Sequence, residues 1–320
     1  AVWTGAPQWQ IEGLRRVVQK LGHDVITAED GQQGIEVAKR ELEELGQPRY
    51  NRKIVNFFST AAIRGNPGQI NYVAAKMGNV GITRVVAQEW ARYHVNCNAR
   101  FEGVYTSNEL PHFIKNMPYE YDGNPALGEL LASAATAAGV PTRAHSDTTL
   151  NLEYGTLVPM RYMNADRHFK VVSVSALCTV HNLADSARLG RAMREAVERD
   201  YDGKVAFFAS GSLSHRFAQN GVAEEYMHKM WSPYLEEFDH HVVEMWKKGD
   251  WKTFCALLPE YADKGHGEGF MHDTAMLLGA LGWDAYTAGV EVVTPFFPSS
   301  GTGQINAIFP VQPLTAPVAA

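Results

Sequence analysis

The chain has 320 residues, 45% of them hydrophobic, and a formal net charge of −6. This composition supports a substantial buried core and excludes a chain that is disordered throughout. The acidic balance gives little support to nucleic-acid binding, and no apolar run reaches the roughly 18 residues that a membrane span requires. Three widely spaced cysteines predict neither a disulfide framework nor a CxxC zinc site, so we expect a reducing, cytoplasmic environment.

The first 49 residues predict two strand–helix units. A short strand at residues 1–6 precedes apolar positions spaced as on one helix face, over residues 11–21. Residues 23–28 are typical of a second strand, and residues 34–45 of a charged amphipathic helix. This alternation of strands and helices is typical of an α/β fold, in which helices cover a mostly parallel or mixed central sheet on both faces.

The alternation continues through residues 50–98. A strand at residues 53–60 ends near Ser59, and a helix from about residue 71 to 93 carries Tyr72 and Lys76. These two side chains are four residues apart and therefore lie on one helix face. An ordinary exposed helix pair is one interpretation of them. Residues 95–98 predict the next strand.

Ser59, Tyr72 thirteen residues later, and Lys76 are together similar to the catalytic pattern of the short-chain dehydrogenases/reductases. The resemblance implies that Tyr72 exchanges a proton, that Lys76 favours its phenolate, and that Ser59 orients a substrate carbonyl. It also implies that Gly5 lies in the loop that binds an NAD(P) cofactor.

The nucleotide loop departs from that family. Only Gly5 remains of its glycines, and Pro7 and Trp9 add bulk where the backbone must approach a pyrophosphate. Between Leu45 and Ile54 there are also too few residues for the rest of a dinucleotide fold. We therefore expect NAD(P)H binding to be weak or absent.

The remaining residues predict further helices and strands. Helices are expected at about residues 126–138, 185–198, 224–258 with a break at 249–250, and 272–281. Strands are expected at residues 150–157, 170–177, 204–210 and 305–309, and residues 296–304 are expected to form a loop.

His215 follows the expected strand at residues 204–210, at the end of the segment Gly211-Ser-Leu-Ser-His215. Small residues allow a sharp turn and leave room for a ligand, and an imidazole can serve as general acid or base near neutral pH. A histidine that only hydrogen-bonds to the strand end is the alternative.

Five segments resemble the homoprotocatechuate 2,3-dioxygenases, which are extradiol ring-cleaving enzymes of the protocatechuate 4,5-dioxygenase superfamily. They are residues 101–111, 152–163, 210–217, 258–263 and 267–273. The resemblance spans about two thirds of the chain and implies Fe(II), O2 and a small aromatic diol, 3,4-dihydroxyphenylacetate.

That resemblance assigns roles to single residues. Glu268 matches the carboxylate ligand of the iron, and His215 matches the acid/base histidine. Tyr154 is a weaker candidate for a second acid/base group, and Arg161 is a candidate partner of the substrate carboxylate. Alternatively, Glu268 caps the following helix and Arg161 forms a structural ion pair.

The two iron-ligating histidines that the resemblance implies lie in His-Val-Pro and Asp-Thr-His-Trp segments, and neither segment occurs here. Only His23 and His94 precede residue 100, so they and His181 are the candidate replacements. The chain therefore resembles a join of two families near residues 94–100, and a natural fusion, a design and a misassembled sequence all fit.

We expect a reductase-like segment at residues 1–98 and a dioxygenase-like catalytic region at residues 99–320. We expect the two to form one α/β architecture, in which the N-terminal units replace missing strands of the dioxygenase sheet. A homo-oligomer without nucleic-acid or membrane partners is also expected. The first interpretation is a dioxygenase, the second an NAD(P)-dependent oxidoreductase, and the third an inactive α/β protein.

Overall fold

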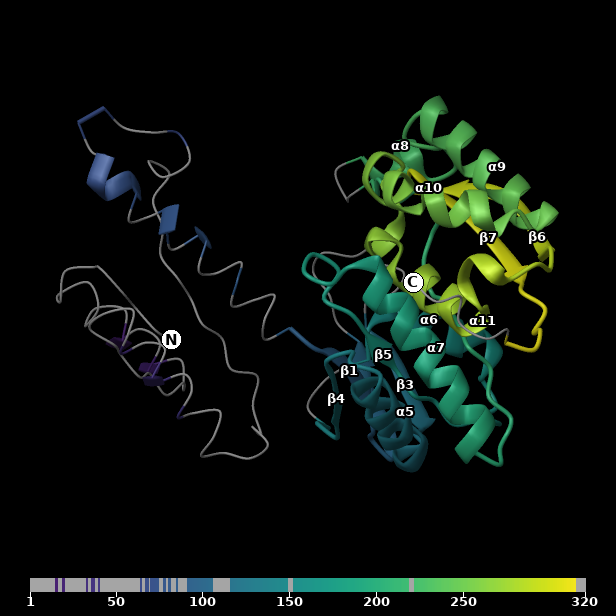
Figure 1. Ribbon diagram of the computed structural model, residues 1–320. Coiled ribbons are helices and arrows are strands. Elements are labelled where there is room, and N and C mark those ends of the chain that lie inside the picture. The colour runs from purple at the N-terminus through teal and green to yellow at the C-terminus, as the bar shows by residue number, and fades with distance from the viewer. Residues whose placement is uncertain are drawn as a thin grey trace. The chain divides into compact units, whose positions relative to one another are not determined.

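In this computed structural model the chain divides into two compact units, Ala1–Trp90 and Ala91–Ala320. The expectation that the N-terminal strands complete the dioxygenase sheet stays a prediction, because those strands lie outside the described residues. The structure describes residues 91–105, 116–148, 152–218 and 222–314, together with scattered positions between 15 and 85. Those scattered positions are mostly helical and agree with the helices predicted there, whereas the strands predicted before residue 61 lie outside the described residues. Figure 1 labels most of the elements of the second unit.

A mixed three-stranded sheet lies at the start of the second unit. Its strand order is β4 (Thr142–His145), β1 (Tyr93–Asn96) and β5 (Val174–Ser175). Strand β1 runs parallel to β4 and antiparallel to β5. This sheet and the helices around it confirm the predicted α/β class with a mixed sheet. The predicted strand at residues 95–98 is β1, shifted by two residues.

Alternate side chains of β1 face a helical layer. Tyr93, Val95 and Cys97 are buried against helices α5 (Pro125–Ala137) and α7 (Leu183–Asp200). Both helices begin at an asparagine whose side-chain oxygen accepts a backbone N–H of the first turn, as the N-cap position favours. These two helices confirm the predictions at residues 126–138 and 185–198.

Helices α7 and α11 (His272–Leu281) cross at backbone contact. A Cβ atom on Gly190 would lie 1.8 Å from the Met276 carbonyl oxygen, and one on Gly279 would lie 1.9 Å from the Ala187 oxygen. Any larger side chain at either position would therefore force the helices apart. The crossing fixes α11, which follows Glu268 directly in the chain.

A chain of hydrogen bonds joins the first strand to the same two helices. The Tyr93 hydroxyl lies 2.8 Å from Ser186 Oγ, which lies 2.7 Å from His272 Nδ1, while His272 Nε2 lies 3.1 Å from the Cys178 carbonyl oxygen. A carbonyl only accepts, so Nε2 carries the hydrogen and Nδ1 accepts from Ser186. Burial lowers the pKa of His272, which favours this neutral form.

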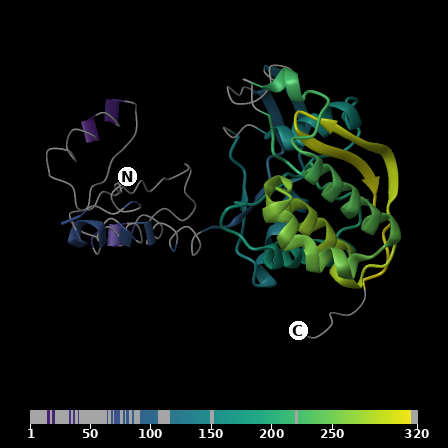
Figure 2. The ribbon, with the colours of Figure 1, turned by 90° about the horizontal axis from the view of Figure 1, so that it is seen from above.

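A second core lies between helices α9 (Pro233–Lys248) and α10 (Trp251–Lys264), helix α11 and a hairpin of strands β6 (Glu291–Ser299) and β7 (Thr302–Ile308). Figure 2 shows the hairpin beside these helices. Gly249 ends α9 in the left-handed region, with φ of +70°, and the Asp250 side chain caps α10. This turn confirms the predicted break at residues 249–250.

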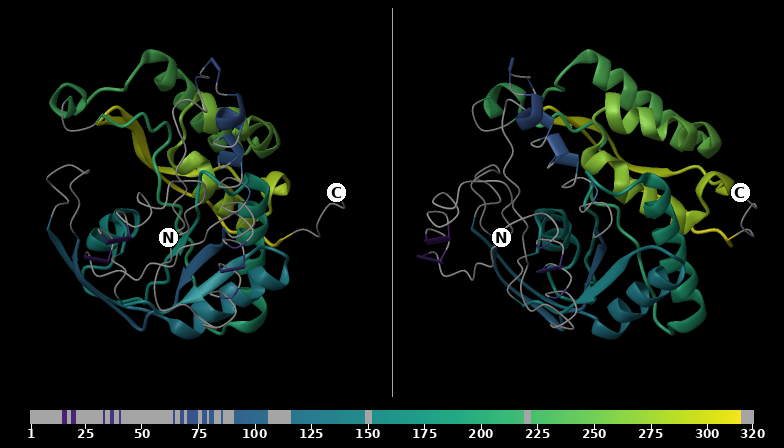
Figure 3. Two further views of the ribbon diagram at one scale, coloured as in Figure 1. Left: turned by 90° about the vertical axis from the view of Figure 1, so that its left-hand side faces the viewer. Right: turned by 60° about the vertical axis from the view of Figure 1, so that its left-hand side comes forward.

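A third core packs under the two-stranded sheet of β2 (Arg100–Tyr105) and β3 (Met117–Asp122), which pair antiparallel. Helix α6 (Tyr154–Met163) supplies Leu157 and Met160 to it. The short helix α8 (Ala223–Tyr226) completes the main elements, and Figure 3 shows the second unit from two further sides. No helix in the part of the chain that the structure describes is long and apolar enough to cross a membrane.

Five local predictions were wrong. The helix expected at residues 224–258 is also interrupted at residues 227–232, between α8 and α9. Residues 204–210 are irregular instead of a strand, because no strand among the described residues pairs with them. Their apolar character is explained by Val205 and Phe207, which pack on the core formed around β1, α5 and α7. Residues 154–163 form helix α6 despite Pro159, since packing overrides β propensity. Within residues 170–177 only Val174–Ser175 is a named strand. Residues 296–304 lie in the β6–β7 hairpin, with positive φ at Ser300 and Gly301 in the turn.

Candidate active site

Two segments far apart in the sequence are bound together around the candidate site. The His215 N–H donates to the His266 carbonyl oxygen at 2.6 Å, and the Glu268 N–H donates to the Leu213 oxygen at 3.1 Å. These bonds flank a bridge between Ser214 and Gly267. The pairing fixes the backbones of His215 and Glu268 relative to one another.

The Glu268 turn has an unusual backbone. His266, Phe270 and Met271 have φ between +51° and +61°, a region that side-chain-bearing residues seldom adopt, and Gly269 has φ of +55°. Such conformations cost of order 1–3 kcal/mol each and often occur at functional sites. The short 3₁₀ turn Glu268–Met271 presents the Glu268 carboxylate toward the His215 segment.

Three groups converge on the Glu268 carboxylate. The Tyr154 hydroxyl donates to Oε1 at 2.9 Å, the Ser212 N–H donates to Oε2, and His215 Nε2 lies 3.5 Å from Oε1. The Glu268 side chain is 19% exposed and that of His215 is 26% exposed, so a small ligand can reach both. The structure thus brings together Glu268, His215 and Tyr154, which the sequence proposed as site residues.

The electrostatics of this cluster keep Tyr154 protonated. Burial raises the pKa of Tyr154 well above its ordinary value, and the negative charge of Glu268 and their hydrogen bond raise it further. The phenol therefore acts as a hydrogen-bond donor to the carboxylate near neutral pH. It orients Glu268 and is a poor proton acceptor.

A second carboxylate, Asp273, lies near Glu268. Burial raises the pKa of Asp273 to about 6, and the charge of Glu268 adds to the increase. Its Oδ2 would lie 2.4 Å from a Cβ atom on Gly211, so the glycine leaves the space that this carboxylate occupies. Sequence reasoning missed both Asp273 and the Ser212 N–H, although both lie inside segments that it had singled out.

Arg161 lies two turns beyond Tyr154 on helix α6 and is exposed. Its positive charge acts on Tyr121, whose pKa is raised by burial and lowered in part by Arg161. Among the described residues no hydrogen bond or ion pair joins Arg161 to Glu268 or His215. Its proposed contact with a substrate carboxylate stays a prediction.

The reductase-like residues do not form a described site. Tyr72 lies in a helical stretch at residues 70–74 of the first unit, where its side chain is 46% exposed. Ser59, Lys76 and Gly5 lie outside the described residues, as do Pro7 and Trp9. Their predicted arrangement around Tyr72 therefore stays a prediction.

The described donors do not fit a metal centre with two histidines and one carboxylate. In the described ranges no three His, Cys, Asp or Glu side chains gather in a way that could hold a metal ion. His94 faces His145, with ring centroids 5.7 Å apart, and His181 stacks on Tyr93 at 3.8 Å. His23 lies outside the described residues. Among the described residues neither His94 nor His181 joins Glu268, and the predicted role of Glu268 as an iron ligand stays a prediction.

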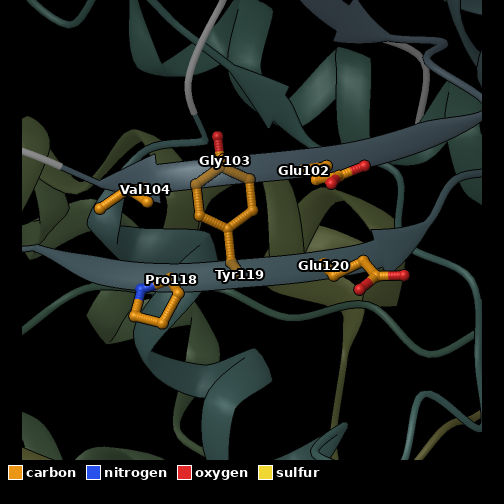
Figure 4. A pocket seen from close by; sticks show the side chains of 6 residues that line it. All are labelled: Glu102, Gly103, Val104, Pro118, Tyr119 and Glu120. Carbon is orange, nitrogen blue, oxygen red and sulfur yellow. The ribbon is translucent and has the colours of Figure 1, made fainter.

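A shallow hollow on the β2–β3 sheet is separate from this cluster (Figure 4). Its lining includes the carboxylates Glu102 and Glu120, which form ion pairs with Arg100, and Glu120 also pairs with Arg167. Both carboxylates are exposed and already paired with arginines. None of the site residues described above lines the hollow.

The sequence of the second unit defines the class of the protein. Residues 76–310 match the family model described as the catalytic LigB subunit of aromatic ring-opening dioxygenase, and the chain belongs to this family. Residues 32–110 also match a model of short chain dehydrogenase, which supports the description of the chain as a chimera. The two matches overlap around the predicted join.

Individual relatives divide the chain in the same way. The chain is 56% identical to the 3,4-dihydroxyphenylacetate 2,3-dioxygenase of Escherichia coli over 205 residues, which is 64% of this chain and 74% of the relative. It is 38% identical over 71 residues to a 12alpha-hydroxysteroid dehydrogenase of a Clostridium species, covering 22% of this chain and 27% of the relative. A 3-oxoacyl-[acyl-carrier-protein] reductase of Staphylococcus epidermidis is 36% identical over 88 residues, covering 27% of this chain and 36% of the relative. The chain therefore spans only a minor part of these dehydrogenases.

Proposed function

We propose that the second unit carries the acid/base part of an extradiol dioxygenase site, which acts on 3,4-dihydroxyphenylacetate with Fe(II) and O2 in aromatic catabolism. The observation that carries the proposal is the convergence of His215 and Tyr154 on Glu268. The proposed substrate follows from the name of the Escherichia coli relative and its 56% identity.

The proposed role of His215 is proton transfer. Its side chain is partly exposed and Nε2 lies beside the Glu268 carboxylate, so the imidazole can accept a proton from a catechol hydroxyl and return it later in the reaction. Tyr154 and the Ser212 N–H hold the carboxylate from either side and fix its orientation. Arg161 is the proposed partner of the substrate's acetate group, through a charge-assisted pair.

The proposed iron site is incomplete in the described residues. A facial triad needs two histidines besides the carboxylate, and the described chain brings neither His94 nor His181 to Glu268. A lone carboxylate competes poorly with water for a transition metal. We therefore expect ring cleavage far below that of an intact dioxygenase.

Oxygen uptake tests this proposal directly. The protein is loaded with Fe(II) without air, and consumption of O2 is measured with 3,4-dihydroxyphenylacetate, together with the yellow ring-fission product. Weak turnover is expected, and it should be lost in His215→Ala and Glu268→Ala. His168→Ala is the matched control, because its side chain is 81% exposed and pairs only with Asp166 among the described residues. Turnover that survives both site changes would overturn the assignment.

A second candidate is an NAD(P)-dependent short-chain oxidoreductase, supported by the family match over residues 32–110 and the Tyr72 and Lys76 pair. Enhanced NAD(P)H fluorescence on mixing with the protein would support it, and Tyr72→Phe should then abolish turnover. If the protein shows neither fluorescence enhancement with NAD(P)H nor O2 uptake with the diol, that result supports the third interpretation, an inactive α/β protein. A cytoplasmic homo-oligomer without nucleic-acid or membrane partners completes the proposal.

A further inference from the structure

A buried carboxylate lies directly behind the segment that carries His215. Asp239 on helix α9 is fully buried. Its Oδ1 accepts the Ser214 N–H at 3.1 Å and the Tyr261 hydroxyl at 2.6 Å, and its Oδ2 accepts the Ser214 hydroxyl at 2.8 Å. Two of these three bonds thus come from the residue next to His215.

Ser214 is the point at which the candidate site is attached to the rest of the second unit. On one side it bridges to Gly267, between the bonds that hold His215 and Glu268 together. On the other side its carbonyl oxygen accepts the N–H of Gly303 in strand β7 at 3.1 Å. A shift of Ser214 would therefore move His215 relative to the Glu268 carboxylate.

The carboxylate fits closely into its place. A Cβ atom on Gly303 would lie 1.8 Å from Asp239 Oδ2, so the glycine provides the room that the buried group needs. Leu235, Asp239, Val242 and Trp246 are all buried on one face of α9. A carboxylate at a core position of an amphipathic helix stands out against that apolar pattern.

Stability alone is a weak explanation for this group. Burial raises the pKa of Asp239 to about 6 although three donors surround it, so its charged form costs folding free energy at neutral pH. An apolar residue of similar volume often serves stability as well as a buried charge does. A carboxylate can instead accept all three donors at once, because it has two oxygens and no hydrogen to place.

We propose that Asp239 is a positioning residue, which acts through Ser214 to hold the His215 imidazole in place beside Glu268. Tyr261 on helix α10 donates to Oδ1, the same carboxylate oxygen that accepts the Ser214 N–H, so contacts from α9, α10 and β7 all help to fix the position of Ser214. The inference deepens the proposed function and rests on it, since His215 is the proton-transfer group there.

Nuclear magnetic resonance of the His215 ring tests this without turnover. Ring signals are assigned with His215→Gln and then compared in Asp239→Asn and Tyr261→Phe. We expect both variants to shift and broaden the His215 signals. Tyr286→Phe is the matched control, because it removes a buried hydroxyl of the same core that donates to the Pro310 carbonyl oxygen at 2.8 Å, away from the site.

The outcomes separate positioning from general stability. The inference holds if Tyr261→Phe changes the His215 signals while Tyr286→Phe, at a comparable loss of melting temperature, leaves them unchanged. It is overturned if His215 is unaffected in folded Tyr261→Phe. Should Asp239→Asn fail to fold, Tyr261→Phe still decides, because it keeps the carboxylate and removes one donor.

Turnover adds a second measurement where the proposed function holds. Tyr261→Phe should then lower kcat about tenfold with KM nearly unchanged, since small misplacements of a catalytic group have effects of this size or larger. If the wild-type protein takes up no oxygen, the proposed function is contradicted. The positioning role of Asp239 is then tested by the His215 ring signals alone.

Discussion

The two tyrosines proposed for proton chemistry depend on the chain in different ways. Tyr72 and Lys76 are four residues apart, so any stable helix places them on one face. Tyr154 reaches Glu268 across 114 residues of sequence, through helix α6, the 3₁₀ turn at Glu268 and the packing between them. A local motif can therefore persist in a fragment of its original fold, whereas the Glu268 cluster requires an assembled unit.

The largest expected effect breaks the assembled unit at its helix crossing. Gly279→Ala would place a methyl group 1.9 Å from the Ala187 carbonyl oxygen, a backbone atom that cannot rotate away. Overpacking of this kind costs about 3 kcal/mol or more, so we expect a large drop in the melting temperature measured by circular dichroism. In the first unit, Gly78→Ala has no described atom within 4 Å and should change stability little. Equal effects of the two changes would contradict the contrast.

The next largest expected effect is on the pH dependence of the free energy of unfolding, which tests the buried Asp239 of the assembled unit. The pKa of Asp239 is about 6 in the folded protein and 3.8 for an ordinary aspartate, so the folded state holds the extra proton between these values. Its contribution to stability is therefore fully present below about pH 4 and is lost as the pH rises through 6, on the order of 2–3 kcal/mol. Urea unfolding of wild type and Asp239→Asn from pH 4 to 7.5 should show the wild type gaining stability relative to the variant as the pH falls. A constant difference would refute the buried charge.

The smallest expected effect separates the two tyrosines. Tyr154→Phe removes the donor to Glu268 Oε1 and should lower any oxygen uptake about tenfold. Tenfold corresponds to about 1.4 kcal/mol, close to the lower end of the range for a hydrogen bond to a charged group. Tyr72→Phe should leave oxygen uptake unchanged, because it lies in the other unit. Loss of oxygen uptake in Tyr72→Phe would show that the two motifs serve one site.

The sequence was sufficient for the elements and site residues with strong local patterns. Helices α5, α7, α10 and α11 and the end of α9 follow from the local pattern, and Glu268 and His215 follow from short segments that resemble a known family. It failed at residues 204–210, where an apolar run resembles a strand although no strand within the described ranges pairs with it. Pairing depends on distant residues, which a local pattern does not reveal.

Asp239 is a second case in which a local pattern does not reveal contacts with distant residues. Its position on the apolar face of α9 could have marked it as unusual, yet its three donors come from Ser214 and Tyr261, 25 and 22 residues away. The Ser212 N–H could not be predicted from its own residue type, because a backbone group binds Glu268 there. The candidate replacement ligands His94 and His181 likewise could not be judged from the sequence, because their surroundings come from residues distant in the chain: His94 faces His145 and His181 stacks on Tyr93.

The hydrogen-bond chain from Tyr93 through Ser186 to His272 sets a limit on how this protein can be taken apart. Tyr93 is at the first position of β1, three residues after the boundary between the two units, and its hydroxyl begins a chain that ends on the helix after Glu268. A shorter fragment that starts after Tyr93 would leave the buried Ser186 hydroxyl, which contacts His272, without its tyrosine partner. A fragment that keeps this chain of hydrogen bonds must therefore include Tyr93, which places any junction with a new N-terminal sequence before that residue.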